Sequence, residues 1–491
     1  MKYLVLLCMV FIATSAKADS FTVNKMLGRG MNLGNMLDAP SEGEWGVTLD
    51  SAYFPLIKSK GFTSVRIPVR WSTAARMDTA APYTVHPAFL ARVKWAIDQA
   101  LKNGLAAVVN VHHYNELFDN PDGQHDRFVS IWKQAAPLFK NYPDSLVFEI
   151  LNEPNTNLTM SKWNSLLNET LDTIRHSNPK RCVMVGTAEW GGIGSLGALK
   201  LPKNDPNLIL TVHYYLPFTF THQKASWVKG SAQWEVGWTG DYFERKSIAD
   251  DFEYVAQYAK ENNVPVYVGE FGANKGADMA SRARWTAYCT GLFKRMGFSW
   301  SYWEFCSNFG IYDPDAKKIR DTLVNALITP DTGTLKEAAP KLKMGHSILQ
   351  NGNFALGRQH WTLITTGGSA RDTVMKGACR LSITDPGAHT NSVQLTQGNF
   401  TLDKGARYAL SFDAWSAAPK TIGVRVQDIE FHSSYLMYRS VPLTSKKRHF
   451  LKVFTMAQTR QDCRVCFEAG GIDTNGVYIA NVALCPLDNS R

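Results

Sequence analysis

Short apolar runs alternate with longer amphipathic stretches over residues 28–330. Between the runs, apolar residues recur at helical spacing, for example at Phe89, Val93 and Ile97. Eight strands separated by helices predict a (β/α)8 TIM barrel. An open doubly wound sheet would more often carry a glycine-rich phosphate loop after its first strand, and this sequence has none. The strand candidates are residues 31–36, 63–69, 105–113, 146–153, 181–188, 207–215, 264–271 and 298–304.

The pattern changes after about residue 345, where helical periodicity gives way to short runs that alternate apolar and polar residues. Residues 408–412 form one such run, and turn residues separate it from the next. This pattern is typical of a β-sandwich or jelly roll, which we expect over residues 346–491. The connection, residues 331–350, is too short for a flexible tether and has no long tract of Ser, Thr or Pro. We therefore expect the sandwich to lie close to a barrel over residues 19–345.

The amino terminus has the features of a secretory signal peptide. Met1-Lys2 precedes an apolar run over residues 3–14, and the small residues Ala16 and Ala18 suit a signal peptidase. The run is too short for a permanent anchor, and no other segment is long and apolar enough for a membrane helix. We therefore expect residues 1–18 to be removed and the mature chain to be secreted, either from the cell or into a periplasm.

Composition describes a soluble globular chain. Of 491 residues, 45% are hydrophobic and 20% charged, which leaves ample material for a core. The net charge of +10 raises the question of nucleic-acid binding. The basic residues are scattered, however, apart from residues 446–448, so a solvated surface without a nucleic-acid partner is the preferred interpretation.

Of the eight cysteines, Cys8 would leave with the signal peptide, and the seven that stay cannot all pair within one chain. Cys463 and Cys466 form a CxxC sequence, but an odd separation along a strand places them on opposite faces. A disulfide or a shared metal between these two is therefore disfavoured. Pairing among Cys379, Cys463, Cys466 and Cys485 stays open.

Polar and aromatic residues gather at the carboxyl ends of the predicted barrel strands, where barrel enzymes carry their active sites. Two of the apolar runs end in a glutamate, Glu153 and Glu270. Retaining glycoside hydrolysis uses two such carboxyl groups, because one protonates the leaving oxygen while the other attacks the anomeric carbon. The other strand-end residues are Arg66, His112, His113, Asn152, His213, Tyr214, Tyr215, Trp303 and Glu304.

These residue types suggest individual roles. Arg66 and Tyr215 are suited to hold Glu270 ionised, and a neighbouring histidine with partial burial is suited to keep Glu153 as the acid. Asn152 is an amide suited to the sugar 2-hydroxyl. A lone glutamate after an apolar strand is more often a helix cap or a surface residue. Catalysis is favoured here because all these positions share the same face of the predicted barrel.

Other strand-end residues carry alternatives. Trp303 offers an apolar face on which a pyranose ring can stack. Glu149 is expected on the same strand face as Glu153, as a structural carboxylate held inside the barrel by a basic partner such as Arg66. Glu189, after the fifth strand candidate, is a competing but disfavoured catalytic carboxylate. The pair His112-His113 has no further ligand at metal spacing, so neither a metal nor a cofactor is expected.

Seven motifs follow one another along the barrel region. They are Met31-Asn32-Leu33-Gly34-Asn35, Arg66-Ile67-Pro68-Val69, Val111-His112-His113, Leu151-Asn152-Glu153-Pro154, His213-Tyr214-Tyr215, Gly269-Glu270-Phe271-Gly272 and Tyr302-Trp303-Glu304-Phe305. Together they resemble glycoside hydrolase family 5, whose members are retaining (β/α)8 enzymes that include endo-β-1,4-glucanases and β-mannanases. Asn-Glu-Pro alone recurs in related families, but the ordered set is specific.

This resemblance implies that Glu153 is the acid/base and Glu270 the nucleophile. The segment 213–223, followed by Trp227, is similar to a cellulase branch that contains bifunctional glucanase/mannanase enzymes. We therefore expect a secreted, retaining endo-β-1,4-glucanase without a cofactor. Mannanase, xyloglucanase or mixed-linkage glucanase activity is the nearer alternative, and a glycan-binding protein on an inactive barrel the remote one. The implied supporting and substrate-binding residues are Asn35, Arg66, His112, His113, Asn152, His213, Tyr215, His222, Trp227 and Trp303.

The final region resembles carbohydrate-binding modules of the family 4 and 9 type in residues 351–354, Trp361 and the run 408–415. The resemblance implies a jelly roll that binds glycan chains. Trp361, Trp415 and Tyr435 are candidates for stacking on sugars, although Trp415 fits equally well as a buried anchor of the sandwich. A structural domain without a ligand is the alternative. We expect a monomer that acts on a polysaccharide.

Overall fold

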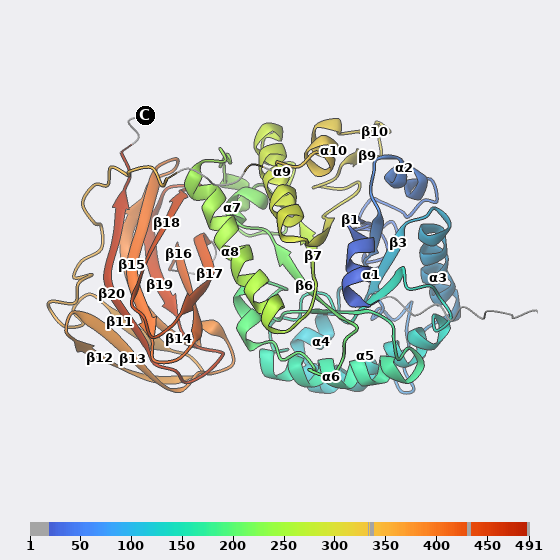
Figure 1. Ribbon diagram of the computed structural model, residues 1–491, viewed down its shortest axis with the longest axis horizontal. Coiled ribbons are helices and arrows are strands. Elements are labelled where there is room, and N and C mark those ends of the chain that lie inside the picture. Colours follow the sequence, from blue (N-terminus) through green and yellow to red (C-terminus); the bar gives the residue numbers. More distant parts are fainter. Residues whose placement is uncertain (1–18, 332, 334–337, 430–433, 489–491) are drawn as a thin grey trace, which may run out of the picture.

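A computed structural model of the protein describes residues 19–331, 333, 338–429 and 434–488. They form two domains, a barrel wrapped in helices and a β-sandwich that packs against its side (Figure 1). The predicted signal peptide, residues 1–18, lies outside the described residues.

Eight parallel strands close into a barrel in chain order, which confirms the predicted fold. Every residue of β2 to β8 is buried, because the barrel interior and the outer helices cover both faces. This burial explains the short apolar runs in the sequence, each of which overlaps one strand. The strands are β1 Arg29–Asn32, β2 Ser64–Ile67, β3 Ala106–Asn110, β4 Leu146–Glu149, β5 Val183–Gly186, β6 Leu208–Tyr214, β7 Val266–Phe271 and β8 Ser299–Tyr302.

Helices connect the strands and form the outer layer of the barrel (Figure 1). In α3, Val93 and Ile97 are buried as their spacing predicted. Asp241 and Glu244 form a capping box that begins α8. The helices are α1 Ser20–Leu27, α2 Tyr53–Ser59, α3 Pro87–Lys102, α4 Asn115–Asp119, α5 Pro121–Leu138, α6 Met160–Ser177, α7 Phe218–Thr221, α8 Tyr242–Glu261, α9 Met279–Met296 and α10 Asp321–Ile328, with 3₁₀ turns η1 Ile193–Ala198 and η2 Ser231–Gln233 and the hairpin β9 Tyr312–Asp313 and β10 Lys318–Ile319.

Helix α1 closes the amino end of the barrel. Its apolar residues Val23 and Leu27 are buried against residues such as Val108. The side-chain amide of Asn24 donates a hydrogen bond to the carbonyl of Val266 at 3.0 Å. With this end covered, the groups at the carboxyl ends of the strands form the mouth of the barrel.

The second domain consists of two five-stranded antiparallel sheets, in the orders β11-β14-β19-β16-β17 and β12-β13-β20-β15-β18. Apolar residues from both sheets fill the core between them, which confirms the predicted β-sandwich. The strands are β11 Thr362–Thr365, β12 Ser369–Met375, β13 Ala378–Asp385, β14 Val393–Leu402, β15 Arg407–Ser416, β16 Lys420–Asp428, β17 Ser434–Leu443, β18 Arg448–Thr455, β19 Arg460–Glu468 and β20 Val477–Pro486, with the 3₁₀ turn η3 Thr390–Ser392.

The three aromatic residues proposed to stack on sugars occupy different environments. Trp361 and Tyr435 are each 3% exposed and belong to the sandwich core, so their proposed place on a sugar-binding surface is wrong. The ring of Trp361 packs on Phe354 instead. Trp415 is partly exposed and stacks on Tyr478 with ring centroids 5.0 Å apart, so it is not a buried anchor.

Polar contacts join the two domains along α8, which faces the sandwich (Figure 1). The ammonium of Lys452 lies 3.0 Å from Asp250, and the hydroxyls of Tyr254 and Thr421 lie 3.0 Å apart. Lys452 is buried, so this ion pair is largely shielded from water. The domains are therefore in close contact, as the short connection predicted.

The seven cysteines in the described part of the chain are buried thiols, and none of them forms a disulfide. Cys463 lies in the sandwich core, whereas Cys466 contacts the hydroxyl of Thr396. These two thiols thus point to opposite faces of β19, as their odd separation predicted. The pairing left open by the sequence does not occur.

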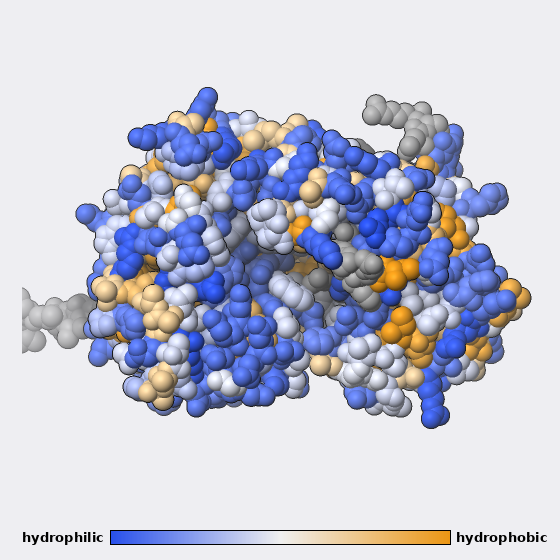
Figure 2. Space-filling view, turned by 180° about the vertical axis from the view of Figure 1, so that it is seen from behind, coloured by the Kyte–Doolittle hydropathy of each residue, from blue (hydrophilic) through white to orange (hydrophobic). Residues whose placement is uncertain are grey.

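The face shown in Figure 2 is mainly hydrophilic, with apolar side chains scattered over it. Within the described ranges, no helix is both long enough and apolar enough to cross a bilayer.

Replacing Asp251 by asparagine should stabilise the protein at neutral pH. Asp251 is buried in α8, where it accepts a hydrogen bond from the Tyr214 hydroxyl at 2.9 Å. Burial raises the pKa of Asp251 to about 7, although the charge of Lys452 opposes this shift. The folded state therefore binds this proton more tightly than the unfolded state, and the free energy of unfolding falls as pH rises from about 4 to 7.

In the Asp251→Asn variant, the free energy of unfolding does not fall in this way as pH rises. The gain in its thermal unfolding midpoint over the wild type should therefore grow from pH 4 to pH 7 and stay constant above that. Asp250→Asn is the matched control, because it removes the neighbouring carboxylate that pairs with Lys452 and should lower the midpoint. A gain of Asp251→Asn that did not change with pH would contradict the assignment.

Candidate active site

Arg66 lies at the base of the barrel mouth and is completely buried. Its guanidinium donates to both carboxylate oxygens of Glu149, at 2.6 and 2.9 Å, and to Glu270 at 2.7 Å. It also donates to the side-chain oxygens of Asn152 and Asn32, at 2.7 and 2.9 Å. Burial alone would lower the pKa of Arg66, but the charges of Glu149 and Glu270 raise it. The cation on β2 thus ties together groups from three other strands, β1, β4 and β7, and the predicted contact with Glu149 is present.

Glu270, on β7, is surrounded by hydrogen-bond donors and rings from other strands. Besides Arg66, the phenol of Tyr215 donates to its carboxylate at 2.9 Å. Burial and the charge of Glu270 raise the pKa of Tyr215, so the phenol keeps its proton. Nδ1 of His213 and Nε2 of His112 lie 3.7 and 3.8 Å from the same carboxylate. This fixed orientation is what a carboxylate nucleophile requires.

Glu153 lies beyond the end of β4. The strand ends at Glu149, and Glu153 has a φ of 45°, in the left-handed region. The prediction that Glu149 and Glu153 share a strand face is therefore wrong, because the chain has already left the sheet before it reaches Glu153. The carboxylate of Glu153 lies 2.8 Å from Nδ1 of His213, and its side chain is 25% exposed. It is thus the more accessible of the two glutamates, since the side chain of Glu270 is only 6% exposed.

His213 stands between the two glutamates. Burial would lower the pKa of His213, but the charge of Glu270 and the hydrogen bond to Glu153 outweigh it and raise the pKa overall. One oxygen from each glutamate and a ring nitrogen of His213 all lie within 4.8 Å of one another. Two carboxyl groups this close can act on the same carbon atom of a substrate.

One wall of the mouth combines imidazoles and indoles. The rings of His112 and Trp303 stack in parallel with centroids 5.6 Å apart, and Trp45 meets His113 edge-on at 5.5 Å. Burial lowers the pKa of His112, and it lowers the pKa of His113 to about 4. Both imidazoles are therefore neutral at neutral pH. Neutral polar rings beside flat apolar ones suit a sugar, which has both hydroxyls and apolar faces.

The segment after β6 forms a second wall. His222 stacks on Phe218 at 4.2 Å and meets Tyr215 at 5.0 Å. Burial lowers the pKa of His222 to about 3, so it is also neutral. Trp227 is 56% exposed, with its ring 6.4 Å from that of His222. The structure thus brings the sequence-predicted residues of strands β2, β3, β4, β6, β7 and β8 to one mouth.

Two buried carboxyl groups behind the mouth were not assigned roles from the sequence. Asp38 accepts two backbone N–H groups, including that of Asn35, and burial raises its pKa to about 7. Glu304 accepts the N–H groups of Ser307 and Phe309, and burial raises its pKa to about 8. The side chain of Asn35 partly opposes this rise in the pKa of Glu304. The position of Glu304 at a strand end was a usable signal in the sequence. The burial of Glu304 and its hydrogen-bond partners were not visible there.

Histidines and carboxylates come together at the mouth closely enough to raise the question of a cation. In one set the oxygens of Asp38 already accept backbone N–H groups, and in the other the carboxylate of Glu270 already accepts hydrogen bonds from Arg66 and Tyr215. Because these carboxylate oxygens are already engaged by the protein itself, we assign no metal to either set. The two sets are Asp38, His112 and His113, and Glu153, His213 and Glu270.

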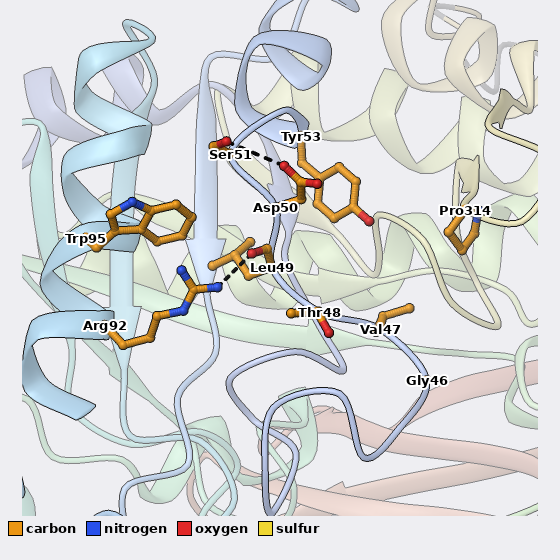
Figure 3. Close-up of a pocket in the computed structure, with 10 residues that line it drawn as sticks. All are labelled: Gly46, Val47, Thr48, Leu49, Asp50, Ser51, Tyr53, Arg92, Trp95 and Pro314. Carbon is orange, nitrogen blue, oxygen red and sulfur yellow. Dashed lines mark hydrogen bonds between the residues drawn. The ribbon is translucent and has the colours of Figure 1, made fainter. Parts of the chain in front are cut away.

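A cavity of about 340 Å³ lies beside the loop that carries Trp45 (Figure 3). It is lined mainly by residues 46–51 of this loop and by Arg92 and Trp95 of α3. The guanidinium of Arg92 lies 4.0 Å from the centroid of the Trp95 ring and pairs with Glu42 at 2.7 Å. Neither catalytic candidate lines this cavity. The converging titratable groups place the candidate active site at the barrel mouth instead.

A closed eight-stranded barrel with two adjacent carboxyl groups at its mouth is the arrangement found in barrel glycoside hydrolases. Residues 22–309 match the family described as cellulase, glycosyl hydrolase family 5. The chain belongs to this family, as the sequence motifs predicted. Residues 346–476 match a carbohydrate binding domain.

Individual relatives agree with this assignment. The chain is 35% identical over 327 residues to endoglucanase H of Acetivibrio thermocellus, and the match covers 65% of this chain and 35% of that protein. It is 30% identical over 305 residues to cellulase/esterase CelE of the same organism, covering 58% of this chain and 36% of that protein. The chain therefore spans about a third of the length of these two relatives.

Solved structures are similar over the barrel. Cel5A of Thermotoga maritima in complex with cellobiose is 47% identical, with a TM-score of 0.62, and the match covers 63% of this chain and 100% of that one. Its complex with mannotriose is 46% identical, with the same TM-score and coverage.

Proposed function

We propose that the protein hydrolyses internal bonds of β-1,4-glucan chains with retention of anomeric configuration. The observation that carries the proposal is the approach of Glu153 and Glu270, whose carboxylate oxygens lie within 4.8 Å of each other beside His213. Carboxyl groups about 5 to 5.5 Å apart serve retaining hydrolysis, whereas inversion uses about 6.5 Å or more. Family membership and the likeness to endoglucanases support the same reaction.

The reaction then has two steps. Glu270 attacks the anomeric carbon while Glu153 gives its proton to the leaving glycosidic oxygen, so a glycosyl-enzyme forms as the bond breaks. Glu153 next takes a proton from water, whose oxygen attacks the same carbon and releases Glu270. Arg66 and Tyr215 orient Glu270 and stabilise its charge when it is released.

The surrounding side chains are proposed to hold the sugar chain. The oxygen of Asn152 is engaged by Arg66, which leaves its amide N–H groups for the sugar 2-hydroxyl. Trp303 provides a flat surface for a pyranose ring. The other residues proposed to contact or shape the substrate site are Asn35, His112, His113, His213, His222 and Trp227.

The choice of sugar is tested by comparing polysaccharides. Glucan is the first candidate, and mannan is the second because a similar barrel has been solved with mannotriose. Initial rates of reducing-sugar release should be highest on carboxymethylcellulose or mixed-linkage β-glucan, compared at equal mass with xyloglucan and galactomannan. Release from galactomannan alone would replace the glucanase proposal by a mannanase. No release from any of the four would leave only the glycan-binding alternative.

Retention has its own measurement. In a digest of cello-oligosaccharides followed by proton NMR, the β-anomer of the new reducing end should appear first. The α-anomer should then grow at the rate of spontaneous mutarotation. If the α-anomer came first, the enzyme would be inverting and Glu270 would not form a covalent intermediate.

We also propose that the protein is exported, with residues 1–18 as a cleaved signal peptide. Support comes from their apolar run, and from Asp19, which caps the first described helix directly after the proposed cleavage point. Sequencing the amino terminus of the secreted protein tests this, and a secreted chain that still begins at Met1 would contradict it.

A further inference from the structure

The loop Glu189–Gly191, just after β5, has an unusual backbone. Its three residues have φ values of 57°, 59° and 65°. Non-glycine residues adopt this left-handed conformation in succession only when their surroundings impose it. The loop is therefore a segment whose shape depends on the groups that hold it.

This loop is bonded to the chain segments that carry the candidate acid/base and its histidine. The N–H of Trp190 donates to the carbonyl of Pro154 at 3.2 Å, and the carbonyl of Gly191 accepts the N–H of His213 at 2.9 Å. A Cβ added to Gly191 would lie 3.1 Å from the His213 ring and 3.4 Å from Cγ of Glu153. A shift of the loop would therefore move Glu153 and His213 directly.

The sandwich domain holds the loop from outside the barrel. Nδ1 of His389, in the turn before η3, lies 3.1 Å from the carboxylate of Glu189. The backbone of His389 is itself fixed, because it exchanges hydrogen bonds with Ser392 at 3.2 and 2.9 Å. The hydrogen bond to Glu189 raises the pKa of His389 in spite of partial burial, which favours a charged contact. Nearby, Arg425 and Glu468 pair with each other at 3.0 Å.

We propose that His389 is a positioning residue of the hydrolase, which orients Glu153 by holding the loop through Glu189. The sandwich is then part of the catalytic unit, independently of any glycan that it binds. This inference rests on the proposed role of Glu153 as acid/base. It also gives Glu189 a role other than catalysis.

The kinetic signature follows from the chemistry of the leaving group. The alkoxide of a departing sugar is a poor leaving group and needs a proton from Glu153, whereas a dinitrophenolate leaves without one. The ratio kcat/KM reports the step up to formation of the glycosyl-enzyme. A displaced Glu153 therefore slows kcat/KM on cello-oligosaccharides and spares it on an activated aryl cellobioside.

His389→Ala in the full chain should lower kcat/KM for cellotetraose about 3- to 10-fold, the scale of one lost hydrogen bond. For 2,4-dinitrophenyl cellobioside the change should be below about 2-fold. His389→Asn, whose side-chain N–H can replace Nδ1–H, should restore most of the lost rate. In the double variant with Glu189→Ala, the two losses should not add, because both act through one contact.

Lys404→Ala is the matched control. It removes another ion pair between the domains, with Glu235 at 2.8 Å, in which both side chains are exposed and neither belongs to the loop. Its rates on both substrates should equal those of the wild type. Thermal unfolding midpoints of all variants should accompany the kinetics.

Three results would overturn the inference. They are unchanged rates in His389→Ala, equal losses on both substrates, and a failure of His389→Asn to restore cellotetraose cleavage, which would leave only a structural role. A wild-type protein that cleaves neither substrate would instead contradict the proposed function, so the two failures are distinguishable.

Discussion

Glu270→Gln should reduce kcat on β-glucan by about 10⁴-fold or more, because an amide cannot replace the carboxylate that forms the covalent bond. Binding should change little. The amide has nearly the same shape, and its oxygen can still accept from Arg66 or Tyr215, which now donate at 2.7 and 2.9 Å. Steady-state rates on β-glucan, together with calorimetric titration of the variant with cellotetraose, measure the two effects separately.

Glu169→Gln is the matched control, since this glutamate lies on the outer helix α6 with a side chain 51% exposed. It should leave the rate unchanged. Activity of Glu270→Gln near the wild-type level would refute the nucleophile assignment. An unfolding midpoint equal to that of the wild type is required before the loss of rate is assigned to chemistry.

Glu153→Ala should lower hydrolysis of β-glucan by about 10²- to 10⁴-fold, the usual contribution of a general acid and base. An aryl cellobioside with a dinitrophenolate leaving group should still form the glycosyl-enzyme, because that group needs no proton. Hydrolysis of this intermediate is then slow, since no base activates water. Azide, a small nucleophile that needs no base, should enter the vacated space, restore turnover and yield β-cellobiosyl azide.

The rate with and without azide and the NMR spectrum of the product provide the measurement. Azide should not accelerate the wild type, in which the Glu153 carboxylate fills this space. An α-azide would assign the nucleophile to Glu153 and reverse the two roles. No effect of azide, combined with equal losses on both substrates, would remove Glu153 from proton transfer.

Much of the barrel was predictable because burial leaves a mark on every strand. Strands β2 to β8 are covered on both faces, so they had to be short apolar runs, and the residues that follow them had to meet at one rim. Arg66, Tyr215 and Glu270 were identified in this way, and their mutual contacts are present.

The same reasoning failed where a buried apolar run continues beyond the end of its strand. Ile150 and Leu151 are as buried as the strand before them, although β4 has ended at Glu149. The apolar pattern therefore could not show that Glu153 sits on a turn with positive φ. In the sandwich, Trp361 and Tyr435 are core residues, since aromatic side chains serve cores and sugar-binding surfaces equally well.

The sequence by itself determined the order of the elements, the two glutamates and the ring of polar residues at the strand ends, because these follow from local patterns of apolar and polar positions. Only the tertiary structure decided the distances between them. His213 reaches Glu153 across 60 residues of chain, and His389 reaches Glu189 across 200. Such contacts depend on how strands and domains pack, and packing is a property of the whole chain that no local pattern encodes.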